Sequence, residues 1–172
     1  NYQGGRRAGE FMAEHLGGKG NIVLMRYDAN SQSTVEREQG FLDVIAQHPD
    51  IKLLMDDKHA GPLESGAIQL GEEIVAKFGQ QMQGIFCPNQ STASGMLTVL
   101  KRSGLTGKVA LVGFDSGENL AQGLESGEMQ ATVLQDPVTM GYEAVNTMYR
   151  HLKGEQVADH IATKEFLATS KN

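Results

Sequence analysis

Short apolar runs alternate with amphipathic stretches along the whole chain, and glycine or asparagine separates many of them. Runs rich in Ile, Val, Leu and Phe predict buried strands. Between these runs apolar residues recur at helical spacing, as Ala8, Phe11, Met12 and Leu16 do, which predicts amphipathic helices. Repeated alternation of strand and helix is the pattern of parallel β/α construction.

The predicted helices and strands follow one another in strict order. Continuous apolar strands suit a sheet that is covered on both sides, so the predicted fold is α/β, a doubly wound parallel sheet flanked by helices. Ser33 or Thr34 is the expected N-cap of the second helix. The predicted helices span about Arg6 to Leu16, Val35 to Gln47, Leu63 to Phe78, Ser91 to Arg102, Glu118 to Ser126 and Val138 to Lys153. The predicted strands span Asn21 to Met25, Ile51 to Met55, Gly84 to Cys87, Val109 to Gly113, Gln130 to Leu134 and a final extended run, Ala162 to Ala168.

Composition narrows the possible functions. The 172 residues fit one domain of ordinary size, and a formal net charge of -6 with dispersed Lys and Arg argues against nucleic-acid binding by this segment. A single cysteine, Cys87, excludes an internal disulfide, and we expect a buried, inert thiol. No histidine lies at metal-ligand spacing, and no nucleophile elbow or phosphate-binding loop occurs, so we expect neither metal, nor cofactor, nor enzymatic activity.

Four polar residues follow successive predicted strands or lie near their ends: Arg37, Asn89, Asp115 and Gln135. In open parallel sheets ligands bind at the carboxyl ends of the strands. Guanidinium, carboxylate and carboxamide groups can each bond two neighbouring hydroxyls, so this set suits a polyol. Each residue also has a structural reading. Arg37 could be a surface ion pair, Asn89 a turn residue, Asp115 a cap of the next helix, and Gln135 part of a helix start before Pro137.

Four motifs carry a specific resemblance: Arg37-Glu38-Gln39-Gly40-Phe41, Phe86-Cys87-Pro88-Asn89, Val112-Gly113-Phe114-Asp115 and the run from Ala131 to Pro137. Together they resemble periplasmic sugar-binding proteins of the ribose-binding type, over the whole chain. The resemblance implies that Arg37, Asn89, Asp115 and Gln135 contact a monosaccharide or related polyol, and that an ABC-type permease is a partner. The alternative is the effector-binding core of a lactose-repressor-type regulator, which a preceding helix-turn-helix would indicate.

The same resemblance predicts how the chain is divided. Residues 1–135 are expected to form the C-terminal ligand-binding lobe, residues 136–160 a helix that belongs to a missing N-terminal lobe, and residues 161–172 the final strand and tail. Because the chain opens with Asn1 rather than Met, we expect a fragment of a periplasmic or lipid-anchored extracellular protein. The stripe of Val138, Val145, Met148 and Leu152 is then expected to be covered by self-association or by docking on the chain's own sheet.

One departure from the family pattern concerns the ligand. Relatives often place an aromatic side chain from the loop that corresponds to Asp56 to Pro62 against the sugar. Here that loop holds Gly61 and Pro62, with His59 nearby. The sequence therefore leaves open whether the ligand is a pentose, a hexose or a modified polyol.

Overall fold

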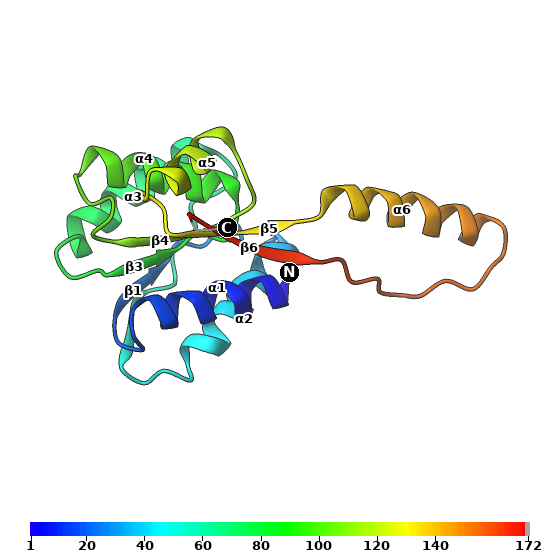
Figure 1. Cartoon of the computed structure of the whole chain (residues 1–172), viewed down its shortest axis with the longest axis horizontal. Coiled ribbons are helices and arrows are strands. Elements are labelled where there is room, and N and C mark those ends of the chain that lie inside the picture. Colours follow the sequence, from blue (N-terminus) through cyan, green and yellow to red (C-terminus); the bar gives the residue numbers. More distant parts are fainter. Residues whose placement is uncertain (171–172) are drawn as a thin grey trace.

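The computed structural model describes residues 1–170, which form an α/β body with a helical arm projecting from it (Figure 1). The last two residues of the predicted tail, 171 and 172, lie outside the described residues. The helices are α1 Tyr2–His15, α2 Gln32–Ile45, α3 Glu64–Phe78, α4 Gln90–Arg102, α5 Glu118–Glu125 and α6 Pro137–Leu152. The strands are β1 Gly20–Leu24, β2 Ile51–Met55, β3 Gly84–Phe86, β4 Ala110–Phe114, β5 Ala131–Gln135 and β6 Glu165–Thr169.

One six-stranded sheet organises the body, in the order β2-β1-β3-β4-β5-β6. Strands β1 to β5 pair in parallel, and β6 returns antiparallel to β5. The chain moves outward from β1 to β2 and then crosses back to β3, so the direction of winding changes between β1 and β3. That switch point, at the carboxyl ends of the strands, is where open sheets of this kind bind ligands. The predicted fold class is confirmed, with one antiparallel edge strand.

The central strands β3 and β4 are apolar and buried throughout because both faces of the sheet are covered. On one face Ile22 and Leu24 pack with residues of α1 and α2, among them Met12 and Phe41. On the other face Val23 joins a larger cluster from α3, α4 and α5. Alternate strand residues thus enter different cores, as the two-residue repeat of a strand requires. The polar groups at the strand ends lie on this two-layered apolar support.

The crossing of α1 and α2 explains an error in the predicted start of the first helix. The helix begins at Tyr2 rather than near Arg6, so Gly4 and Gly5 lie inside it. A Cβ on Gly5 would lie 1.8 Å from the backbone oxygen of Arg37, a severe overlap. The glycines therefore permit close packing of two helices rather than ending one. This close approach fixes the segment of α2 that carries Arg37.

Helix α2 begins earlier than predicted. Its N-cap is Ser31, not Ser33 or Thr34, and the Thr34 hydroxyl donates to the Ser31 carbonyl oxygen over 3.0 Å. Thr34 is buried within the helix. Several serine and threonine residues in a row can each cap a helix, so the sequence alone does not select among them. The other predicted elements agree with the structure except at their ends.

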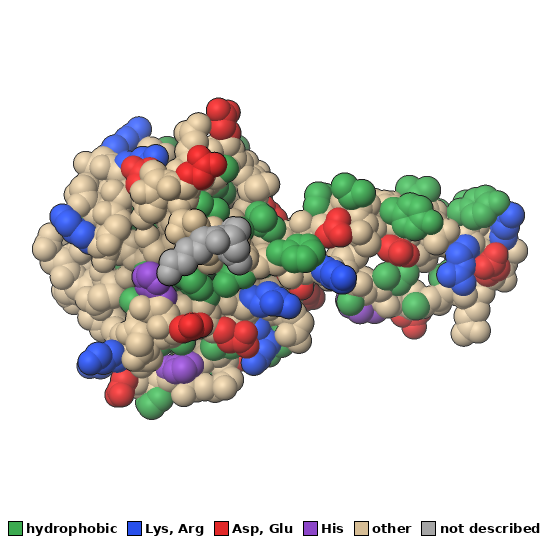
Figure 2. Space-filling view, viewed as in Figure 1, with side chains coloured by type: hydrophobic (Ala, Val, Ile, Leu, Met, Phe, Trp, Pro, Cys, Tyr) green, Lys and Arg blue, Asp and Glu red, His purple; other side chains and the backbone are tan. Residues whose placement is uncertain are grey.

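Helix α6 has no buried residue, although its sequence is amphipathic. It extends away from the sheet, and a segment that includes residues 155–164 returns beside it to β6 (Figure 1). The expectation that this helix docks on the chain's own sheet is therefore wrong, because the short link after β5 directs it outward. Apolar side chains gather along one edge of the arm in Figure 2. The exposed large apolar residues of the helix are Val138, Met140, Tyr142, Val145, Met148, Tyr149 and Leu152.

Candidate functional site

The guanidinium group of Arg37 lies at the centre of the candidate site. Its Nη1 donates to the carbonyl oxygen of Pro88 over 2.9 Å, and its Nη2 donates to Oε1 of Gln135 over 3.1 Å. Nη1 is also 3.5 Å from a carboxylate oxygen of Asp115, and Nε donates to Oδ1 of Asn1 over 3.1 Å. One side chain from α2 thus joins the ends of β3, β4 and β5.

The same guanidinium stacks on an aromatic ring, with its central carbon 3.8 Å from the centroid of Phe114. Cation–π stacking and four polar contacts hold a side chain that is only 7% exposed. Burial lowers the pKa of Arg37 from its ordinary value, and Asp115 opposes this effect. Arg37 is therefore a nearly dehydrated cation with a fixed orientation, not a flexible surface group.

Asp115 has an unusual backbone conformation. Its φ is 68°, the one positive value at a non-glycine position among the described residues. Such a conformation carries a cost and often occurs at functional sites. The hydroxyl of buried Thr132 donates to the Asp115 carbonyl oxygen over 2.8 Å, and the Asp115 amide donates to the Val133 carbonyl oxygen over 2.8 Å. These bonds from β5 fix the direction in which the carboxylate leaves β4.

The carboxylate of Asp115 lies against the start of α4. Burial raises the pKa of Asp115 above its ordinary value, and Arg37 and the backbone amide of Gln90 offset this only in part. Hydroxyl donors would therefore be favourable additional partners for this carboxylate. The structure also corrects the alternative reading of Asp115 as a helix cap, because the N-cap of α5 is Gly117.

Asn89 has a defined structural role as the N-cap of α4. Its Oδ1 accepts from the Thr92 amide over 3.2 Å, and its own amide donates to the Thr92 hydroxyl over 3.3 Å. Its Nδ2 donates to the Ser91 hydroxyl over 3.2 Å. Asn89 therefore reaches the Arg37 cluster through the neighbouring Pro88 carbonyl oxygen, while its own side chain is directed toward α4. The structure thus brings three of the four predicted residues into contact and places the fourth beside them.

Gln135 ends β5, directly before the arm. The following residues start α6 as expected, with Asp136 as N-cap and Pro137 in the first turn. A recess of about 680 Å³ opens here between the arm and the body. It is lined by Gln135 and, among others, Tyr2, Glu36, Met148 and Glu165. Gln135 therefore faces both the Arg37 cluster and open space.

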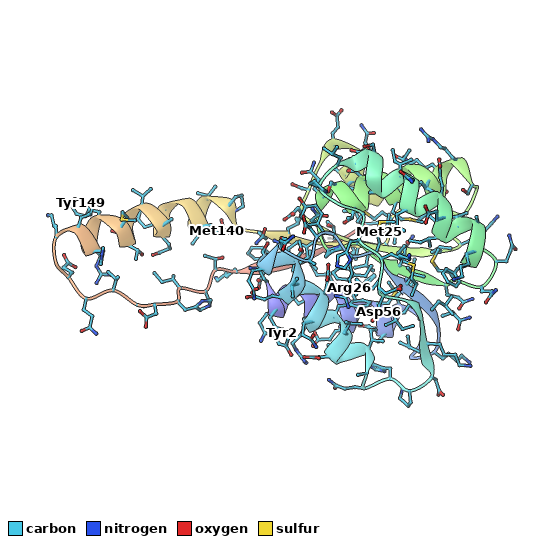
Figure 3. All side chains as sticks on the ribbon, turned by 180° about the vertical axis from the view of Figure 1, so that it is seen from behind. Tyr2, Met25, Arg26, Asp56, Met140 and Tyr149 are labelled. Atoms are coloured by element: carbon cyan, nitrogen blue, oxygen red, sulfur yellow. The ribbon has the colours of Figure 1, made fainter. Side chains whose placement is uncertain are left out.

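A second polar network at the switch point was not identified from the sequence. Arg26 and Asp56, which follow β1 and β2, lie near each other and near α2 (Figure 3). Arg26 Nη1 is 2.7 Å from the carboxylate of Glu38, whose side chain is 1% exposed. The only signal in the sequence was that Arg26 and Asp56 each follow a predicted apolar strand directly. Their spacing does not predict that they pair with Glu38.

The remaining chemically interesting groups are inert or scattered. Cys87 is fully buried, and burial raises the pKa of its thiol far above the ordinary value. Among residues 1–170, no three His, Cys, Asp or Glu side chains are grouped so that they could hold a metal ion. Within the same range, every helix is too short or too polar to cross a bilayer.

Comparison with known proteins decides the family. Residues 1–156 match the model described as periplasmic binding protein domain. The chain belongs to this family. A xylitol-binding protein of Mycolicibacterium smegmatis is 32% identical over 148 residues, which cover 86% of this chain and 42% of that protein. A ribose import binding protein of Haemophilus influenzae is 32% identical over 161 residues, 94% of this chain and 53% of the relative.

Solved structures of family members have the same fold. The periplasmic component of an ABC-type sugar transport system from Hahella chejuensis is 31% identical, with a TM-score of 0.91 over 97% of this chain and 60% of that chain. A solute-binding protein of an ABC transporter from Agrobacterium vitis with bound D-fucose is 29% identical. Its TM-score is 0.93, and the match covers 100% of this chain and 59% of that chain. The chain thus spans about half the length of the curated relatives it matches.

Proposed function

We propose that this chain supplies one wall of the ligand site in a solute-binding protein that captures a monosaccharide or related polyol for an ABC-type importer. Arg37, Asn89, Asp115 and Gln135 are the proposed ligand-binding residues. The relatives described above, which include xylitol- and ribose-binding proteins, support this class of ligand. They do not favour the lactose-repressor-type regulator.

The convergence of Arg37, Asp115 and Gln135 carries the proposal. One guanidinium lies 3.1 Å from a carboxamide oxygen and 3.5 Å from a carboxylate oxygen, so donors and acceptors that suit neighbouring hydroxyls are gathered in one place. Because Arg37 is nearly buried and Asp115 is partly buried, both have already lost part of their hydration, and a hydroxyl that replaces the remaining water loses little. Nothing in this arrangement requires a bond to be broken, so the proposed task is capture.

The proposed division of the chain follows from the arm. Residues 1–135 form the proposed ligand-binding lobe, residues 136–160 belong to a second lobe, and residues 161–172 return as the final strand and tail. The absence of buried residues in α6 supports this division. The second lobe would add about three polar contacts of roughly 1.5 kcal/mol each to the ligand. We therefore expect this chain alone to bind sugar about three decades more weakly than a two-lobed relative.

The proposed partners follow from the same function. They are the sugar, the membrane permease of an ABC transporter, and the second lobe. The proposed location is the periplasm or, for a lipid-anchored form, the outer surface of the membrane. In the absence of the second lobe, the exposed apolar face of α6 is proposed to mediate self-association.

A titration followed by NMR tests the proposed function at the weak affinity expected. Xylitol, D-ribose, D-apiose and D-allose are added in turn to the 15N-labelled chain, and the amide shifts are recorded. We expect shifts at the loops after β3, β4 and β5. Gln135→Leu should weaken binding about tenfold, because it removes hydrogen bonds worth about 1 to 1.5 kcal/mol.

The matched control is Gln122→Leu, the same substitution at an exposed position of α5. It should leave the affinity unchanged. Two outcomes would contradict the proposal: no shift with any of the four compounds, or shifts that map away from the strand-end loops. Equal weakening by both substitutions would remove Gln135 from the site.

A further inference from the structure

The charged network on the β1 side of the switch point has no role in the site described so far. Its members are Arg26 after β1 and Asp56 after β2, which Figure 3 labels, together with Glu38 in α2. Glu38 is the residue next to Arg37. The two neighbours therefore extend from the same turn of α2 toward different parts of the carboxyl edge of the sheet, Arg37 toward β3 to β5 and Glu38 toward β1.

The network is a partly buried ion pair, in which the Glu38 side chain is 1% exposed and the Arg26 side chain is 22% exposed. One carboxylate oxygen of Glu38 accepts from Nη1 of Arg26 over 2.7 Å, and the other accepts from the Tyr27 amide over 3.2 Å. Nε of Arg26 donates to the backbone oxygen of Asp56, and Nη2 lies 3.7 Å from the Asp56 carboxylate. Burying such a pair is costly unless its polar atoms are satisfied. Here each nitrogen of the guanidinium has a partner.

Arg26 also holds the loop after β2 through its backbone. Its amide donates to the Lys58 carbonyl oxygen over 3.1 Å, and its carbonyl oxygen accepts from the Ala60 amide over 2.8 Å. The next residue, Tyr27, accepts from the Gly61 amide over 2.8 Å. Side chain and backbone together fix residues 56–61 to the end of β1. This loop contains Lys58 and His59 but no Phe, Tyr or Trp.

We propose that Arg26 and Glu38 are positioning residues of the ligand site. Glu38 holds Arg26, and Arg26 holds the 56–61 loop in place as a fixed wall of the site. The inference rests on the proposed function. The wall then contributes backbone and polar groups whose positions are set before the ligand arrives.

Preorganisation is the physical reason to expect an effect on affinity. A loop that must be ordered when the ligand arrives lowers the affinity by the cost of ordering it. A loop ordered beforehand by a partly buried ion pair avoids that cost. Because Glu38 and Arg37 are neighbours in one helix, the same turn of α2 orients the ligand-facing guanidinium and the loop.

The network is specific for arginine at position 26. One guanidinium reaches Glu38 with Nη1 and the Asp56 backbone with Nε, in two directions at once. A lysine ammonium is a single point charge and cannot reproduce that fork. Arg26→Lys should therefore keep the positive charge and still release the loop. This variant thus distinguishes a role of Arg26 in holding the loop from a role in neutralising Glu38.

The test uses the same chain, with amide hydrogen exchange and the NMR titration measured together. The variants are Arg26→Lys, Arg26→Met and Glu38→Gln, and the probes are D-ribose and xylitol. We expect the Ala60 and Gly61 amides to exchange about tenfold faster or more in the variants, while the Asp115 amide keeps its protection. Sugar affinity should fall about tenfold at the same time.

The matched control is Arg102→Met, which breaks an exposed pair with Glu72, 3.8 Å long, at the far end of α4. It should change neither the loop nor the affinity. Should Arg26→Met fail to fold because Glu38 is left buried without a partner, the double variant Arg26→Met/Glu38→Gln removes both charges and gives the same readings.

The outcomes separate this proposal from the function on which it rests. No sugar-dependent shift in the unsubstituted chain would refute the proposed function and this inference with it. A different result would refute the positioning role alone. In that case the unsubstituted chain binds sugar, and Arg26→Lys and the double variant bind it with the same affinity. Loss of overall stability with unchanged affinity would reduce the network to a structural ion pair.

Discussion

Helices α4 and α6 have similar lengths and similar amphipathic patterns, yet they differ completely in burial. Eight of the 13 residues of α4 are buried, whereas none of the 16 residues of α6 is. Helix α4 packs on the sheet beside α3 and α5, and all three helices share one core with the strands. Helix α6 follows β5 after a short link and extends away from the body (Figure 1).

The difference shows that an apolar stripe alone does not determine whether the chain itself covers that face of the helix. The stripe of α4 meets its core within this chain. The stripe of α6 is complete but uncovered, which is costly for an isolated domain. Our proposal that residues 136–160 belong to a second lobe explains both facts, and the predictions below test it.

The largest expected effect comes from shortening one leucine in each helix. Leu100 of α4 is fully buried, whereas Leu152 of α6 is 77% exposed. Leu100→Ala should lower the free energy of unfolding by about 3 to 4 kcal/mol, because it leaves a cavity in the core. Leu152→Ala should change it by less than about 0.5 kcal/mol. Urea denaturation at low protein concentration measures the free energy of unfolding of both variants. Similar losses for Leu100→Ala and Leu152→Ala would contradict the difference in burial between α4 and α6.

The next effect concerns association through the arm. We expect the mass measured by sedimentation to rise with concentration above the 18.6 kDa of one chain. Val145→Glu should weaken this association at least tenfold, because it buries a charge in the contact. Gln69→Glu adds the same charge at an exposed position of α3 and serves as control. A chain that stays monomeric at every concentration would contradict the proposed self-association.

A smaller effect comes from removing the cap of each helix. Asn89→Ala deletes the capping box of α4 and should cost about 1 kcal/mol in global stability. Asp136 caps α6 by accepting from the Thr139 amide over 3.0 Å. Asp136→Ala should reduce the helical circular dichroism signal while leaving the denaturation midpoint almost unchanged, since the arm adds little to the cooperative core. A large shift of that midpoint would show that the arm is part of the core.

The smallest effect is a difference in titration between two aspartates. Hydrogen bonds from Thr139 lower the pKa of Asp136, so its cap is present above about pH 4 and is lost as the pH falls through the folded-state pKa. Burial raises the pKa of Asp115. Its stabilising contribution is therefore fully present below about pH 4 and is lost as the pH rises through the folded-state pKa. Carboxyl 13C shifts should place the midpoint of Asp115 above that of Asp136, and the reverse order would contradict the burial argument.

Much of the fold could be predicted because most strands contain a short apolar run and the helices have an apolar stripe. The errors came from residues with two possible roles. Gly4 and Gly5 can end a helix or allow close packing, and only the contact with Arg37 shows which applies. The direction of α6 could not be predicted either, because its stripe does not state where its cover lies.

The candidate site was predictable where a polar residue follows a strand in a recognisable motif, as Asp115 and Gln135 do. The network of Arg26, Glu38 and Asp56 was not, because it depends on how a turn of α2 crosses two strand ends. The aromatic support of Arg37 by Phe114 was missed for a similar reason. Such contacts arise from the packing of elements that are distant in sequence.

A crystal structure of the chain soaked with xylitol or D-ribose tests the central claim most directly. The account predicts a sugar at the carboxyl edge of the sheet, with hydroxyls within hydrogen-bonding distance of Arg37, Asp115 and Gln135 and adjacent to Asn89. A sugar bound elsewhere, with these four side chains keeping only their present protein partners, would contradict it.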